Sequence, residues 1–222
     1  MRLAALQSPE DVIVERHAGM AEIFRRQGRK REAEREYRRA ITIVENSRHA
    51  LQLDESRITF LSRVWEIYDS FIAFLAEDGR LREALTAADH SRAATLAQRI
   101  EQTRYSRSGI DTVNPQLLAK AEQSVLLIYW LGEDESFLWV STPTQLKQFQ
   151  LPSRKDIEHL VTDYQRVVEQ PRDPLMERRE LGIRLWRLLI SPAANLIQPG
   201  ARVIILPDRS LSRKRPALPK LP

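Results

Sequence analysis

The chain has 222 residues, 42% of them hydrophobic and 29% charged, which is enough apolar material for one large domain or two small ones. Residues 125–131 form the longest apolar run, far short of the roughly 20 residues needed to span a bilayer, and residues 1–9 lack the apolar core of a signal peptide. We therefore expect a cytoplasmic protein without a membrane partner. The formal net charge of +5 arises in residues 202–222, and the lack of cysteine excludes disulfides, thiolate metal ligands and cysteine nucleophiles.

The N-terminal part, residues 1–104, is predicted to be a helical region. No proline occurs between Pro9 and residue 104, and apolar side chains recur there at helical spacing. Gly28 and Gly79 interrupt this pattern in matching settings, each directly before an arginine. Because glycine commonly ends a helix at the C′ position, we expect two antiparallel helix pairs.

A recognisable series of side chains surrounds the first glycine turn. Ala33, Tyr37 and Ala40 fall at i, i+4 and i+7 on one helical face, and Phe24 lies one turn before Gly28. These five residues resemble the aromatic, glycine, alanine, aromatic and alanine series of a tetratricopeptide repeat. The resemblance implies stacked helical hairpins whose concave face binds a peptide or a partner protein.

The second glycine turn matches this series less completely. Leu75, Gly79 and Ala84 keep the pattern, whereas Ala88 and Ser91 replace the later aromatic residue and alanine. Gly79 follows Gly28 by 51 residues, which exceeds the roughly 34-residue period of such repeats. We interpret the repeats as degenerate, and a generic helical bundle with glycine turns is the alternative. Because about three units are usually needed for stability, the region is expected to be a fragment of a longer array.

The apolar pattern changes after a polar linker predicted at residues 105–118. We predict a β-hairpin of residues 125–131 and 137–140, a more exposed third strand at 145–151, a helix over 154–169 with Ser153 as its N-cap, a second helix over 176–190, and a buried parallel strand at 203–206. This second part should thus contain about four strands and two helices. The expected fold class is α plus α/β.

The order of these elements, closed by Leu206, Pro207 and Asp208, resembles the beginning of a CHAT domain, the caspase-like module often found behind tetratricopeptide repeats. The other matching segments are residues 84–99, 126–138, 151–154 and 188–192. The resemblance covers about residues 50–211, and it implies that residues 119–211 are the N-terminal part of such a domain.

The chain also departs from this family. Complete members carry a His and a Cys on later strand ends as a proteolytic dyad, and this chain contains no Cys. Arg209 stands where the family usually has glycine, and residues 212–222 are basic and proline-rich. We therefore expect a truncated caspase-like region that ends in a disordered tail.

No catalytic, cofactor-binding or metal-binding residue is predicted. The four histidines, His17, His49, His90 and His159, lack the short spacing of metal ligands. The seven glycines are too widely spaced for a dinucleotide fingerprint or a phosphate loop. The neighbouring Asp–His pairs, at residues 89–90 and 156–159, have no nucleophile elbow beside them.

The leading hypothesis is a protein-interaction scaffold without catalytic activity of its own. Its helical region would bind a protein or peptide partner, and Arg25, Arg26, Tyr68 and Phe71 are the candidate contact residues. The alternative is that the chain is the N-terminal portion of a CHAT cysteine peptidase whose catalytic His and Cys lie outside it.

Surface chemistry raises three further possibilities: nucleic-acid binding, membrane binding and self-association. The Arg213–Arg215 cluster suggests nucleic-acid binding, but no aromatic residue accompanies it, so we expect a solvated tail and no nucleic-acid partner. The helix over 178–190 carries four arginines beside leucines, and packing on the sheet is expected in preference to membrane binding. The strand at 203–206 is expected to lie at an open sheet edge, which predicts self-association.

Overall fold

A computed structural model describes residues 9–47, 54–99, 114–169, 175–208 and 211. The chain divides into two compact units, a helical unit within Met1–Ser106 and an α/β unit within Arg107–Pro222. The predicted fold class, α plus α/β, is confirmed. Within the described residues, no helix combines the length and the apolar character required to cross a membrane.

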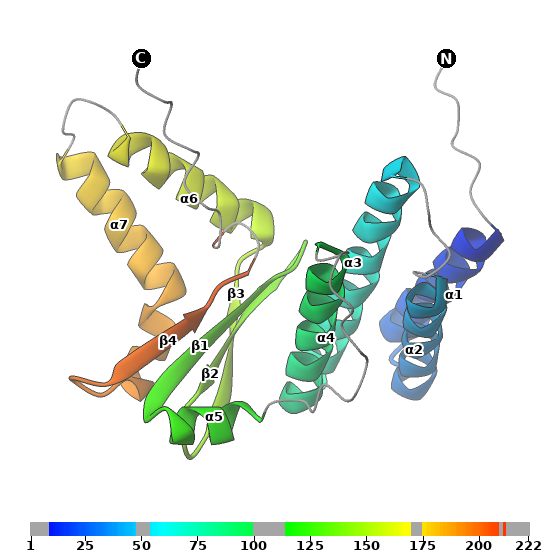
Figure 1. Cartoon of the computed structure of the whole chain (residues 1–222), viewed down its shortest axis with the longest axis horizontal. Helices are drawn as coiled ribbons and strands as arrows, with labels where there is room; N and C mark the ends of the chain where they lie inside the picture. Colours follow the sequence, from blue (N-terminus) through cyan, green and yellow to red (C-terminus); the bar gives the residue numbers. More distant parts are fainter. Residues whose placement is uncertain (1–8, 48–53, 100–113, 170–174, 209–210, 212–222) are drawn as a thin grey trace. The chain divides into compact units, whose positions relative to one another are not determined.

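The helical unit consists of two hairpins (Figure 1). The first joins α1 (Pro9–Arg26) to α2 (Lys30–Ser47), and the second joins α3 (Asp54–Glu77) to α4 (Leu81–Arg99). The two helices of each hairpin pack against one another, and α2 also packs against α3. The helices predicted on either side of Gly28 and Gly79 are therefore present.

Both glycines end a helix at the C′ position, as predicted, and the hydrogen bonds at each turn form a Schellman motif. At the first, the Gly28 N–H bonds to the Arg25 carbonyl (3.0 Å) and the Arg29 N–H bonds to the Phe24 carbonyl (2.9 Å). The second turn repeats this pair of bonds around Gly79. Gly28 has φ 72° and Gly79 φ 74°, in the left-handed region where a Cβ atom is penalised. Glycine is therefore required by the backbone conformation at both turns.

The predicted small-residue face of α2 is buried. Ala33, Tyr37 and Ala40 are each at most 1% exposed. The Tyr37 ring lies 5.6 Å from the Phe71 ring and 5.7 Å from the Phe74 ring, between ring centroids. Tyr37 therefore packs its aromatic ring against α3 from a face of α2 on which the neighbouring buried residues are small.

The α/β unit contains a four-stranded sheet of order β3-β2-β1-β4. Its strands are β1 (Ser124–Leu131), β2 (Ser136–Ser141), β3 (Leu146–Leu151) and β4 (Arg202–Leu206). Strands β1, β2 and β3 are antiparallel neighbours, and β4 pairs parallel to β1. The predicted hairpin, third strand and parallel strand are all confirmed.

The helices of this unit are α5 (Pro115–Ala121), α6 (Arg154–Val168), α7 (Leu175–Leu189) and the short 3₁₀ helix η1 (Ser191–Leu196). The two helices predicted between the third and fourth strands are present, and two further helices, α5 before β1 and η1 before β4, were not predicted. Ser153 caps α6 as predicted, because its Oγ accepts the Asp156 N–H (3.2 Å). Residues 115–118, which the sequence assigned to a linker, begin α5 instead, since Asn114 Oδ1 accepts the Gln116 N–H (3.0 Å).

One face of the sheet carries the core of this unit. Alternate residues of β1, including Val125, Leu127 and Tyr129, are buried together with Ile157 of α6 and Ala193 of η1. The Tyr129 hydroxyl donates to the Leu189 carbonyl (2.7 Å), which fixes the end of α7 to β1. Burial raises the pKa of Tyr129 to about 12, so the hydroxyl stays a donor at neutral pH.

The structure confirms that β4 lies at an edge of the described sheet, and it corrects the prediction that the strand is buried. Both faces of this strand are largely open, with Val203 36%, Ile205 52% and Leu206 38% exposed. The strand is the last in the sheet, and β1 pairs with it on one side only. Its apolar sequence indicated a strand with covered faces, but local sequence carries no information on what packs over a strand.

The prediction that the second helix of this unit, α7, packs on the sheet is confirmed only in part. Leu188 and Leu189, at its C-terminal end, pack against the core of the sheet. Trp186 and Ile183 are 51% and 40% exposed.

The linker residues 105–113, His49 and the basic tail over 212–222 lie outside the described residues.

Candidate protein-interaction site

The four residues proposed as partner contacts have different surroundings. Tyr68 and Phe71 are only 2% and 4% exposed, so they are core residues and not a contact surface, which corrects the prediction. The Tyr68 hydroxyl donates to Glu45 Oε1 (2.7 Å), and Phe71 packs on Tyr37. They were selected as residues of an inner helix of the repeats, but the packing of α2 against α3 covers them.

Arg25 and Arg26 remain at the surface with carboxylate partners. Arg25 Nε donates to Glu77 Oε2 (3.1 Å), which ties the end of α1 to the end of α3. Arg26 Nε donates to Glu22 Oε1 (3.0 Å) one turn earlier in the same helix. Arg25 therefore joins the two hairpins, whereas Arg26 is 78% exposed and pairs only within its own helix.

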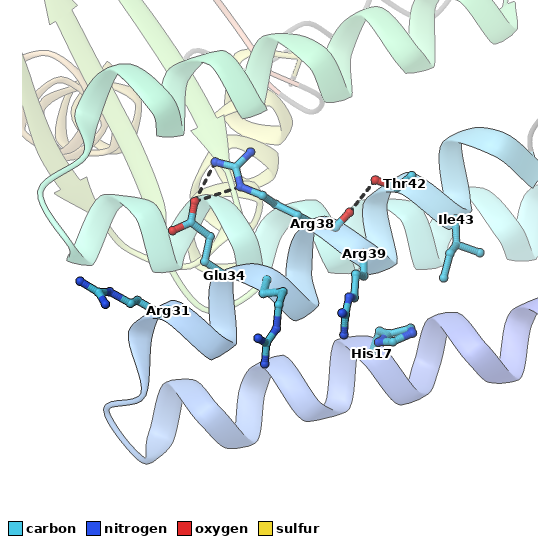
Figure 2. A pocket seen from close by; sticks show the side chains of 8 residues that line it. His17, Arg31, Glu34, Arg38, Arg39, Thr42 and Ile43 are labelled. Carbon is cyan, nitrogen blue, oxygen red and sulfur yellow. Dashed lines mark hydrogen bonds and ion pairs between the residues drawn. The ribbon is translucent and has the colours of Figure 1, made fainter.

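A different set of side chains forms an arginine-rich surface on the helical unit. It surrounds a groove of about 590 Å³ along α2, here called the arginine groove (Figure 2). Its lining residues are His17, Arg31, Glu34, Arg35, Arg38, Arg39, Thr42 and Ile43. The arginines follow the sequence positions i, i+4, i+7 and i+8, which place them along one side of the helix.

A single buried carboxylate lies beneath part of this groove. Glu36 is 3% exposed, and its Oε2 accepts a hydrogen bond from His17 Nδ1 of α1 (2.5 Å). Its Oε1 accepts from Arg39 Nη1 (2.8 Å) and lies 3.6 Å from Arg35 Nε. Burial opposes ionisation of Glu36, but the His17 hydrogen bond and the charges of Arg39 and Arg35 outweigh it and lower the pKa of Glu36.

The shared carboxylate leaves the groove with excess positive charge. Glu36 is one negative group that faces two guanidinium groups, and each guanidinium has five N–H donors. Arg35 and Arg39 are 59% and 55% exposed, so most of their donors face solvent. Figure 2 shows Arg39 and His17 directed into the same side of the groove.

Arg31 adds an uncompensated charge at the end of the groove near the Gly28 turn. It is exposed, and its side chain makes no hydrogen bond or ion pair with the residues that the structure describes. In Figure 2 its guanidinium extends away from α2. This group is available to a ligand without breaking an internal ion pair.

Arg38 and Glu34 lie on the opposite side of the groove from His17. Arg38 Nε and Nη2 donate to Glu34 Oε1 (2.9 and 2.8 Å), and Arg80 holds both oxygens of Glu34 in a bidentate pair (2.6 and 2.9 Å). The Arg80 hydrogen bond lowers the pKa of Glu34 to about 2, against burial, with further contributions from Arg38. Glu34 is therefore ionised and already occupied at neutral pH.

The remaining polar clusters do not assemble a catalytic constellation among the described residues. Ser153 Oγ donates to Asp156 Oδ2 (2.7 Å) within a helix cap, whereas His159 Nδ1 lies 3.0 Å from Asp163 Oδ2. The serine and the histidine thus have separate partners. No group of three or more potential metal ligands occurs in the described part of the chain.

Comparison with known proteins identifies no protein similar to this chain. No family model, curated protein or solved structure matches the chain. The tetratricopeptide and CHAT resemblances therefore stay predictions from the sequence.

The sequence did contain a signal for the arginine groove. Arg31, Arg35 and Arg39 are spaced by four residues, a period that places side chains on one helical face. Glutamates lie between these arginines in the sequence, so a sum of charge along the chain does not reveal the row of arginines. The contribution of His17 depends on the packing of α1 against α2. The prediction of contact residues relied on the inner helices of a repeat, and so it selected other positions.

Proposed function

We propose that the protein is an interaction scaffold without catalytic activity, and that its helical unit binds an acidic segment of a partner protein in the arginine groove. The single observation that carries the proposal is the accumulation of exposed guanidinium groups on one side of α2, of which Arg31 has no internal partner in the described structure. The proposal keeps the scaffold hypothesis and moves the contact surface to α2.

The arrangement of the two hairpins supports a scaffold role. Both glycine turns lie at the same end of the helical unit, because Arg25 pairs with Glu77 and Lys30 Nζ lies 2.5 Å from Asp78 Oδ1 across the two turns. Successive hairpins in one orientation, as in tetratricopeptide arrays, present helix faces side by side to a ligand. Such surfaces bind extended or helical peptides without catalysing a reaction.

The chemistry of the groove favours carboxylates as the recognised groups. Guanidinium groups bind carboxylates in bidentate geometry, and hydrogen bonds between charged groups are stronger than neutral ones. Ile43, half-buried in the lining, offers apolar contact beside the charges. An acidic peptide with an apolar side chain therefore matches the site better than an uncharged one.

The binding test uses a short fluorescein-labelled, glutamate-rich peptide and fluorescence anisotropy with the full 222-residue chain. We expect binding that weakens with added salt, and about fivefold or greater weakening in the double variant Arg31→Gln, Arg35→Gln, because two charge-assisted contacts are lost.

The matched control is Arg184→Gln, Arg187→Gln on α7, which removes the same charge from exposed arginines of the other unit. It should leave peptide affinity unchanged. Equal weakening by both double variants would mean that the peptide responds to net charge alone, and the groove proposal would then be wrong.

The absence of catalysis is proposed on chemical grounds. The chain contains no cysteine, so it lacks the thiol on which a caspase-like peptidase depends. A cytoplasmic location likewise stays a prediction, which rests on the same composition.

A further inference from the structure

Within the residues that the structure describes, no strand pairs with the outer edge of β4. The strand order β3-β2-β1-β4 places β4 last, so its backbone hydrogen bonds to β1 on one side only. Half of the N–H and C=O groups of an edge strand point outward and can pair with another strand. Among the described residues, none forms a ladder on this outer side.

The side chains of β4 make this edge apolar as well as open. The register pairs Val203 with Val125 and Ile205 with Leu127, so both β4 residues stand on the face that carries the buried core. They are 36% and 52% exposed, whereas their β1 neighbours are buried. The apolar surface of the sheet therefore continues past the area that the described helices cover.

The opposite edge of the sheet has different chemistry. Strand β3 carries Lys147, Gln148 and Gln150, and the first and last of these are exposed. Lysine and other polar side chains on an edge strand disfavour pairing with another chain. Strand β4 has one charged residue, Arg202, whose Nη1 is held by Glu122 Oε2 at 2.9 Å.

We propose that a second copy of this chain covers the β4 edge, with the two β4 strands antiparallel about a two-fold axis at Ile204. In this register Val203 of each copy stands opposite Ile205 of the other, an apolar pair of the kind that stabilises antiparallel sheets. Arg202 stands opposite Leu206, so the two guanidinium groups do not face each other. A parallel arrangement in register would place like charges side by side.

The proposed pairing is closed. Two-fold pairing uses the β4 edge of both copies and leaves only the polar β3 edges free, so the assembly stops at a dimer. Pro207 follows β4 and has no N–H to donate, which limits the ladder to five residues. Such a small interface predicts a dissociation constant in the micromolar range and not a permanent dimer.

Sedimentation velocity of the full 222-residue chain tests this, over concentrations from about 1 to 100 µM. We expect a reversible monomer–dimer equilibrium and no larger species. Ile205→Lys places a charge within the apolar pair and should weaken dimerisation at least tenfold, and Val203→Lys should act similarly. Both side chains are already exposed, so circular dichroism should report an unchanged fold.

Leu117→Lys is the matched control, because Leu117 is 65% exposed on α5 and lies outside the proposed ladder. It should leave the equilibrium unchanged. Hydrogen exchange gives a second measure, since the amides of β4 should gain protection as the concentration of the wild-type chain rises.

Three outcomes would overturn the proposal. A wild-type chain that stays monomeric at every concentration would show that a second copy does not cover the β4 edge, and residues 212–222 or a strand of another protein would then be the candidates. Dimers that Ile205→Lys does not weaken would place the interface elsewhere. Growth beyond the dimer would contradict the closed two-fold arrangement.

Discussion

Among single residues, Tyr37 of α2 forms aromatic contacts that join the two hairpins. It is 1% exposed and packs on Phe71 and Phe74, and its hydroxyl donates to Glu22 Oε2 (3.1 Å). Burial, with the Glu22 carboxylate beside it, raises the pKa of Tyr37 well above its usual range. The side chain therefore acts as an aromatic core residue and as a neutral hydrogen-bond donor.

Two substitutions of Tyr37 should separate these contributions. Tyr37→Phe keeps the ring and loses one hydrogen bond, so it should lower the free energy of unfolding by about 1 kcal/mol. Tyr37→Ala also removes the ring and leaves a cavity, which should cost about 3–5 kcal/mol. Chemical denaturation followed by circular dichroism measures both. Similar losses for the two variants would show that ring packing contributes little.

Glu34 gives the helical unit a dependence on pH. Its pKa in the folded chain is about 2, below the ordinary value of 4.5, because Arg80 holds the ionised form. A depressed carboxyl pKa stabilises the fold fully above the unfolded value, and the contribution disappears as the pH falls through the folded one. The loss should therefore occur between about pH 4.5 and pH 2.

The variant Glu34→Gln should lower the free energy of unfolding by about 1 kcal/mol at neutral pH and by less as the pH approaches 2. Glu66→Gln is the control, since Glu66 is exposed and has no ion-pair partner among the described residues. Denaturation across this pH range measures the difference. A constant cost of Glu34→Gln at every pH would argue against the ion pair with Arg80.

At the level of elements, the glycine turns set where the first helix of each N-terminal hairpin ends. Gly28 and Gly79 adopt left-handed backbone conformations, and an added Cβ would meet no neighbouring atom at either. The requirement for glycine is thus conformational and not steric. Gly132, between β1 and β2, is different, because a Cβ there would lie 2.3 Å from the Glu135 carbonyl oxygen.

A comparison of two glycines in the same hairpin tests this interpretation. Gly28→Ala should lower the free energy of unfolding by about 1 kcal/mol or more, because alanine is strained at φ 72°. Gly19→Ala lies within α1 in equally open space and should raise it by up to about 1 kcal/mol, through helix propensity. Thermal unfolding of both variants measures the sign. The same sign for both would contradict a conformational requirement at Gly28.

At the scale of the whole molecule, the two proposed interactions belong to different units of the chain. Peptide binding depends on charge along α2 in the helical unit, whereas self-association depends on apolar side chains of β4 in the α/β unit. Arginine substitutions in the groove should therefore not alter the oligomeric state, and Ile205→Lys should not alter peptide affinity. Each proposal can fail without the other.

Most elements of this chain follow from interactions between residues close in sequence. Glycine at a C′ position, Ser153 at an N-cap and the change from helical to strand spacing near residue 124 each act within a few residues, so the strands, the glycine turns and six of the helices were predictable. The short helices α5 and η1 were not predicted. Which apolar faces are covered required the folded structure, because burial depends on elements distant in sequence. Tyr68 and Phe71 are core residues and not contacts. The open edge at β4 was expected from the sequence, whereas the predicted burial of this strand was wrong. The arginine groove depends on both kinds of interaction. The row of arginines on α2 follows from their spacing in the sequence, whereas His17 joins the groove only because α1 packs against α2.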